Sequence, residues 1–260
     1  MNRTRLLHLT LMAGLASLGA CTDNTAPADS VDDAQVTADV ARSAGDDIAG
    51  QVALMLGNES FAVLPAAPAN FDRFGRAGTD SVVVDRTRTC YDAQDQVVAD
   101  CAPATTRKVV FHVAVDGSRT GTSFSGVVHR VMDLTVVRNF SGAPATEVSR
   151  THDGVGTSAD TTTFTGDNLT RIHAEFATDS INAVTWNLPR VNNPFPVSGS
   201  VVRRMTLHVT VEGANRSGTR DVQRRAEVTF PADAQGNVVL TVNDLTCNLN
   251  LVTRAVTGCH

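Results

Sequence analysis

The sequence predicts an all-β domain, an antiparallel sandwich or an open or half barrel, preceded by one amphipathic helix. Three observations support this fold class. Beyond residue 80, apolar and polar residues alternate with a period of two, the pattern of strands that bury one face. Clusters of Gly, Asn and Asp separate these stretches, which is typical of antiparallel strands joined by turns. Between residues 32 and 57, apolar residues recur every four positions instead, which indicates a helix.

The first 20 residues have the layout of a secretory signal peptide. Arg3 and Arg5 precede a mostly apolar run over residues 6–18, and two small residues follow it. This run is shorter than the ~20 apolar residues that a permanent membrane-spanning helix needs. We therefore expect residues 1–20 to direct export and to be removed.

Leu18-Gly19-Ala20-Cys21 resembles the lipobox of bacterial lipoproteins. The resemblance implies that Cys21 becomes the N-terminus, with a thioether-linked diacylglycerol and an amide-linked acyl chain such as palmitate. Each buried CH₂ contributes about 0.8 kcal/mol, so two or three chains anchor a protein stably. Because Thr22 and not aspartate follows the cysteine, lipoprotein sorting implies the outer membrane, on either its periplasmic or its surface face. The alternative is an ordinary signal peptide followed by a chance cysteine.

The charge of the chain is unevenly distributed. Residues 1–20 carry two arginines and no acids, so their removal changes the net charge from −5 to −7. Residues 22–47 hold seven aspartates and one arginine, which leaves the remainder near neutral. We expect residues 21–31 to form an acidic flexible tether that holds the domain away from anionic lipid. A near-neutral domain argues against nucleic acid as a partner, and the scarcity of Trp and Tyr argues against a sugar-stacking site.

The predicted helix covers residues 32–57. Its apolar positions share one face: Val36, Val40, Ala44, Ile48, Val52 and Leu56. Asp32 and Asp33 suit its N-terminus, and Gly57 suits its end. The helix could touch a membrane or cover a ligand cleft, or it could simply pack on an edge or face of the domain. The acidic polar face favours packing, because helices on membrane surfaces are usually basic.

After a connector over residues 58–79, residues 80–260 form the predicted antiparallel β domain. The expected strands are 81–90, 107–115, 124–138, 146–151, 161–165, 169–177, 180–188, 201–212, 220–230, 237–242 and 245–255. We expect the residues that point into the core to be Ile172, Ala174 and Phe176 in one strand and Met205, Leu207, Val209 and Val211 in another. By the same alternation, Arg171, His173 and Glu175 face solvent. Asp153-Gly154-Val155-Gly156 is predicted to be a turn.

Four cysteines besides Cys21 predict two disulfides, because an even number is typical of exported domains. Of the three pairings available, we expect Cys90–Cys101 and Cys247–Cys259, since each pair brackets a loop of hairpin length. A zinc site is the weaker alternative, because the chain contains no Cys-x-x-Cys motif.

Residues suited to catalysis are scattered. The histidines of the β domain show no ligand spacing: His112, His129, His152, His173, His208 and His260. Those that lie in strands are expected to be solvated. No serine-hydrolase elbow or nucleotide-binding glycine loop is present. The arginines at 203, 204, 216, 220, 224 and 225 would suit an anionic glycan or a lipid headgroup, but near-neutral charge favours the solvent face of long strands. We therefore assign no catalytic residue, no metal ligand and no cofactor.

Together these features predict a lipid-anchored protein of the bacterial cell envelope with a non-catalytic binding or structural β domain. Its partners would be the membrane, through the anchor, and an envelope protein, a polymer or an apolar ligand. Two alternatives stay open. One is a carrier that holds an apolar ligand or lipid between sheet and helix, and the other is an envelope hydrolase with a site spread over loops.

Overall fold

The computed structural model describes residues 31–57, 81–120, 124–142, 144–166, 169–213 and 217–260. The expected signal peptide, Cys21, residues 22–30 of the tether and the connector lie outside this part of the chain. The described residues form one α-helix, α1 (Asp33–Gly57), followed by strands. The strands are β1 (Ser81–Tyr91), β2 (Val97–Val98), β3 (Lys108–Thr120), β4 (Phe124–Ser141), β5 (Thr146–Gly166), β6 (Leu169–Asn187), β7 (Ser198–Gly213), β8 (Ser217–Thr229), β9 (Asn237–Val242), β10 (Leu245–Asn250) and β11 (Val256–Thr257).

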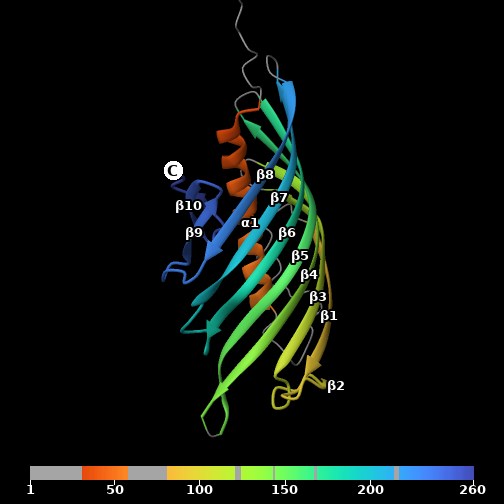
Figure 1. The fold of residues 1–260 in the computed structure, drawn as a ribbon, viewed down its shortest axis with the longest axis vertical. Coiled ribbons are helices and arrows are strands. Elements are labelled where there is room, and N and C mark those ends of the chain that lie inside the picture. The colour runs from red at the N-terminus through yellow and green to blue at the C-terminus, as the bar shows by residue number, and fades with distance from the viewer. Residues whose placement is uncertain (1–30, 58–80, 121–123, 143, 167–168, 214–216) are drawn as a thin grey trace, which may run out of the picture.

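All these strands belong to one open antiparallel sheet (Figure 1). From β3 to β11 each strand pairs with the next one in sequence, and β1 lies between β3 and the short β2. The outermost strands, β2 and β11, are not paired with each other, so the sheet does not close. The predicted all-β fold with one preceding helix is confirmed, and the sheet is of the open type.

The two edges of the sheet are built alike. Each edge strand is only two residues long. Within the described residues, β2 pairs only with Cys90 and Tyr91, so no strand covers the outer side of the rest of β1. A disulfide lies near each edge: Cys90 of β1 bonds to Cys101, and Cys247 of β10 bonds to Cys259. These are the two expected pairings. Each disulfide therefore fixes a segment next to a two-residue edge strand.

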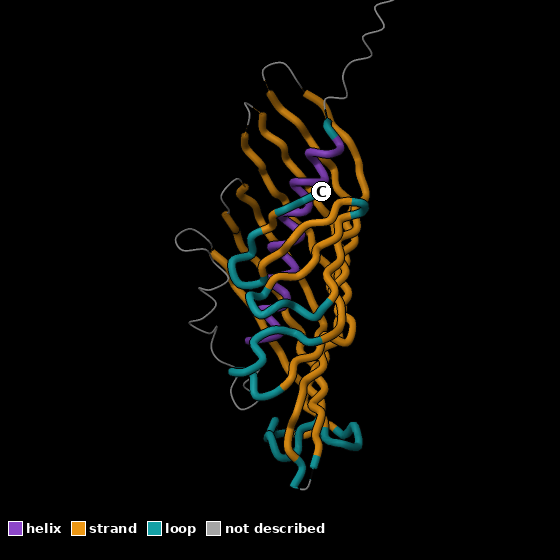
Figure 2. The backbone as a smooth tube through the Cα atoms, turned by 90° about the vertical axis from the view of Figure 1, so that its left-hand side faces the viewer, coloured by secondary structure: helices purple, strands orange, loops and turns teal. Residues whose placement is uncertain are grey.

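The sheet curves around α1, as Figure 2 shows. We call the face that contacts the helix the concave face and the opposite face the convex face. The helix contacts β5 and β7 to β11. Its apolar stripe is at most 3 % exposed: Val36, Val40, Ala44, Ile48 and Val52. The helix therefore packs on the face of the domain, as its acidic polar side favoured, and no helix of the described residues is long and apolar enough to span a membrane.

The predicted turn at residues 153–156 is wrong, because β5 runs through it as one continuous strand. Gly154 and Gly156 lie where β4 approaches closely. A Cβ on Gly156 would be 2.8 Å from the Cγ of Met132, and one on Gly154 would be 2.7 Å from the carbonyl oxygen of Asp133. Glycine inside a strand often marks such an approach, so the motif reflects strand packing.

The predicted orientation of β6 is also wrong. Arg171 and His173 are buried on the concave face beneath α1, and Glu175 shares that face, whereas Phe176 is 56 % exposed on the convex face. The prediction for β7 is confirmed, because the apolar positions 205, 207, 209 and 211 are buried. The alternation along β6 was predicted correctly, but the apolar side was expected to be buried and the charged side is buried instead. The charged side faces α1 because its charged groups pair with those of the helix.

Candidate functional site

A polar stripe runs along α1 beside its apolar stripe. It contains one residue per turn, and all four are at most 4 % exposed: Asp39, Ser43, Asp47 and Gln51. Burial of a carboxylate costs a large amount of free energy unless a cation and hydrogen bonds compensate it. The helix therefore requires cations on the facing sheet.

Arg203 of β7 supplies the central cation and is 0 % exposed. Its Nη2 lies 3.3 Å from Asp47 Oδ2, 3.0 Å from Asp160 Oδ2 and 2.6 Å from Glu175 Oε1. Its Nη1 lies 2.9 Å from Asp179 Oδ2. One guanidinium thus joins α1 to β5 and β6. Desolvation by burial lowers the pKa of Arg203, but the combined Coulombic attraction of the surrounding acids outweighs it, so the pKa lies well above its ordinary value.

A second guanidinium reaches the same group from β4. Nη2 of Arg130 lies 3.0 Å from Asp47 Oδ1, and its Nε lies 3.9 Å from Asp179 Oδ2. The hydroxyl of Ser158 accepts a 2.8 Å hydrogen bond from Arg203 and donates one to Asp160. We call these residues the buried ionic cluster: Asp47, Arg130, Ser158, Asp160, Glu175, Asp179 and Arg203.

The buried ionic cluster contains four carboxyl groups and two guanidinium groups. Desolvation raises the pKa of Glu175; the nearby Asp47 and Asp160 also raise it, and Arg203 opposes the rise. Glu175 therefore keeps its proton to a higher pH than a solvated glutamate does.

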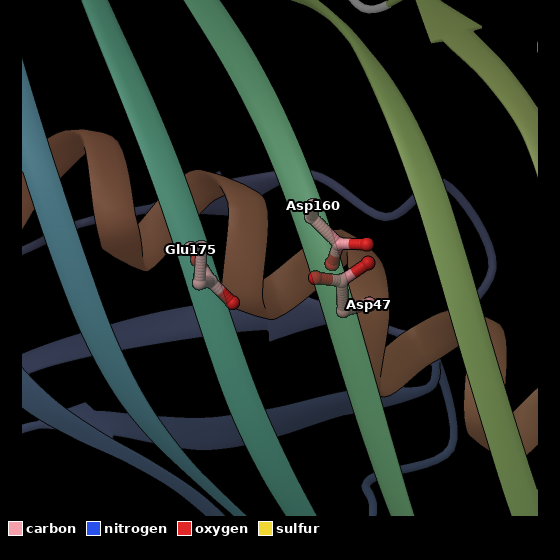
Figure 3. A group of neighbouring side chains, drawn as sticks. All are labelled: Asp47, Asp160 and Glu175. Carbon is pink, nitrogen blue, oxygen red and sulfur yellow. The ribbon is translucent and has the colours of Figure 1, made fainter.

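Three acids of the cluster could in principle hold a metal ion. Oxygen atoms of Asp47, Asp160 and Glu175 lie within 4.8 Å of one another (Figure 3). However, Arg203 Nη2 is within 3.3 Å of an oxygen of each. The guanidinium therefore provides the positive charge at the point where the three side chains converge, and ion pairing accounts for their arrangement.

Further ion pairs follow α1 along the sheet. Asp39 Oδ2 lies 2.5 Å from Nε of Arg171 in β6. Near its N-terminus, Asp33 pairs with Arg224 of β8, and further along Asp46 pairs with Arg254. Each of the four aspartates of α1 thus contacts an arginine from another part of the chain. These acids do not belong to a solvated tether, contrary to what the charge count suggested.

The predicted exposure of the five histidines in strands is correct for three of them. His112, His129 and His208 are exposed on the convex face, and each pairs with an aspartate of the neighbouring strand. His152 and His173 are each 1 % exposed, so solvation was the wrong prediction for them. Burial lowers the pKa of His152 to about 3, with Arg190 as the next cause. Burial likewise lowers the pKa of His173 to about 4, and Asp39 opposes that effect.

The paired arginines divide between the two faces. Arg203 and Arg224 lie on the concave side and contact acids of α1, while Arg204 and Arg225 are exposed on the convex face. The prediction that these arginines lie on the solvent face of the strands is therefore correct for only one member of each pair. The sequence did contain an indication of the buried members: polar residues spaced by four on the helix, which require polar partners.

The chemistry open to the buried ionic cluster is limited by its burial. The four carboxyl side chains of the cluster are at most 7 % exposed. A general acid or base must lie within hydrogen-bond reach of its substrate, and these groups contact arginines. The arrangement fixes α1 to the sheet. No protein-family model, curated protein or solved structure matches the chain.

Proposed function

We propose that this protein is a non-catalytic binding module of the bacterial cell envelope, anchored by lipid at Cys21, and that the convex face of its sheet is its binding surface. The observation that carries the proposal is that most apolar side chains of the concave face are buried. Helix α1 covers the apolar side of β7 to β11 and is fixed there by ion pairs. The convex face is the remaining broad side of the sheet.

The convex face has a composition suited to binding. Large apolar side chains are exposed on it at Val127 (60 %), Val155 (61 %) and Phe176 (56 %). Contiguous exposed apolar patches rimmed by polar groups mark interaction sites, whereas single exposed apolar residues are common on any protein surface. Arg204 and Arg225 lie in the region around Phe176. This combination favours an anionic partner that also offers apolar surface.

Photo-crosslinking in intact cells tests this role. We would place a photoreactive phenylalanine at Val155 in the full-length chain and, as a matched control, at Val252, which is 68 % exposed in the turn after β10. We expect a discrete adduct from position 155 and none from position 252. Equal labelling from positions 155 and 252 would overturn the proposal. So would the absence of an adduct both from position 155 and from the same photoreactive residue placed at position 176.

The carrier of an apolar ligand is the competing function. It requires α1 to leave the concave face, which would separate Asp47 from Arg130 and Arg203 inside the interface. Loss of a partner from a buried ion pair typically costs about 3–5 kcal/mol. Native mass spectrometry of the full-length protein separates the two functions. We expect the mass of the acylated chain alone, whereas a retained lipid that dissociates on activation would support the carrier.

A further inference from the structure

Two arginines oppose each other on the convex face. The register of β7 and β8 places Arg204 directly across from Arg225, and both are exposed. Side chains in such positions have Cβ atoms about 4.5–5.5 Å apart, and like charges there are destabilising. The sheet therefore maintains a local concentration of positive charge in a chain whose net charge is −5.

The charge of this pair is only partly compensated. Arg225 contacts Glu227 at 2.5 Å, and these side chains are 47 % and 31 % exposed. The side chain of Arg204 has no hydrogen bond or ion pair with the described residues. An exposed ion pair contributes about 0–1 kcal/mol, so an incoming anion can compete with Glu227. The pair is thus available to an external anion.

The opposed arginines line a depression of about 360 Å³, within the size range of small-molecule sites. Side chains from four neighbouring segments line it, among them Phe176, Thr178, Arg204, Thr206, Arg225 and Asn243. Strand pairing places Thr178 beside Arg204, and Phe176 beside Thr206. Arginine, hydroxyl and amide groups therefore adjoin one exposed aromatic ring, which gives the depression a donor-rich part and an apolar part.

We propose that this depression binds an organic phosphomonoester, with the phosphate between Arg204 and Arg225 and the organic part against Phe176. A phosphate dianion has enough acceptor oxygens and charge to engage two guanidinium groups. A single carboxylate is already satisfied by one bidentate arginine, so the opposed pair favours phosphate. This inference rests on the proposed binding role of the convex face and names the ligand chemistry of one site on it.

Calorimetric titration of the full-length protein in non-ionic detergent with glucose 6-phosphate tests the site. We expect saturable binding that weakens about tenfold in Arg204→Met and in Arg225→Met, because a hydrogen-bonded charge is lost. We expect stronger binding in Glu227→Gln, which removes the competing carboxylate. Arg42→Met is the matched control, since it removes an exposed positive charge of α1, on the other side of the sheet, and leaves the affinity unchanged.

Further probes distinguish the source of the phosphate. Inorganic phosphate should bind more weakly than glucose 6-phosphate, and Phe176→Ala should lower only the affinity for the organic ester. If vesicles containing phosphatidic acid bind and glucose 6-phosphate does not, the site recognises the same phosphomonoester on a lipid. The absence of saturable binding for all three probes, or equal affinity in Arg204→Met, would overturn the proposal. Crosslinking from Val155 would then still report on the convex face, so the two proposals can fail separately.

Discussion

Arg203 has a full positive charge at a position with no solvent exposure, and it holds together carboxyl groups from three elements. The neighbouring residue, Arg204, has the same side chain on the opposite face of the same strand. The same side chain therefore contributes to stability in different ways at the two positions. One neutralises buried acids, and the other remains available to solvent and to ligands.

Replacement of these two arginines gives a matched comparison. We expect Arg203→Met to lower the free energy of unfolding by about 3–5 kcal/mol, because buried carboxylates lose their cation. Arg204→Met should change it by about 0.5 kcal/mol or less, as is usual at exposed positions. Urea unfolding of the purified variants measures both values. A loss below about 1 kcal/mol in Arg203→Met would contradict the central role of this residue in the buried ionic cluster.

The buried His173 makes stability depend on pH. Its pKa is about 4 in the folded chain, against an ordinary value of 6.5, because burial disfavours the charged ring. The unfolded chain therefore binds the proton first, and stability falls as pH falls from about 6.5 towards 4. We expect His173→Leu to reduce this slope by up to about 1.4 kcal/mol per pH unit.

Urea unfolding at several pH values between 4.5 and 7.5 measures the slope for His173→Leu. The side chain lies between the ring of Phe164, at a centroid distance of 4.9 Å, and the charged pair of Asp39 and Arg171. His208→Leu is the control for loss of a histidine in general, since His208 is exposed on the convex face. If the free energy of unfolding depends on pH equally in His173→Leu and in the wild type, protonation of His173 does not cause the loss of stability at low pH.

At the scale of elements, α1 approaches the C-terminal strands closely at one glycine. A Cβ on Gly45 would lie 2.5 Å from Cγ2 of Val256 and 3.3 Å from Cδ2 of Leu240. At Gly50, one and a half turns later, a Cβ would meet nothing within 4 Å. The same residue type therefore has a packing role at one position and none at the other.

Alanine substitutions at these glycines should have opposite effects. We expect Gly50→Ala to stabilise the protein by up to about 1 kcal/mol, because alanine favours the helix. We expect Gly45→Ala to destabilise it by about 1–3 kcal/mol through overpacking against β11 and β9. Thermal unfolding of both variants provides the measurement. Stabilisation by both would mean that α1 is not held as closely to the sheet as these distances indicate.

The sequence predicted the elements more reliably than their orientation. Periods of two and of four identified the strands and α1, because those periods follow from backbone geometry whatever the environment. They could not place β6, where Arg171, His173 and Glu175 alternate as regularly as the apolar residues do. Which side is buried depends on partners far away in the sequence, such as Asp39 and Asp47. The buried ionic cluster was missed for this reason.

At the scale of the whole molecule, the two faces of the sheet are used differently. Helix α1 packs on the concave face against β5 and β7 to β11, and a disulfide lies near each edge of the sheet. The ion pairs of α1 begin at Asp33, only 12 residues after Cys21. A lipid at Cys21 would therefore join the membrane to the packed domain through a short segment, which limits how far the convex face can lie from the bilayer.

The substitution Cys21→Ser tests the proposed lipid anchor. We expect the wild-type protein to sediment with membranes and to have an intact mass that begins at Cys21 and includes acyl chains. The variant should lose that acyl mass and move to the soluble fraction, since a single chemical change removes the whole apolar anchor. Its thermal unfolding should match that of the wild type, because Cys21 precedes the first ion pair of α1. If the intact mass shows that residues 1–20 have been removed and Cys21→Ser still associates with the membrane, the folded domain itself binds the envelope. The convex face would then be the first surface to test, by substitution of Val155 and Phe176.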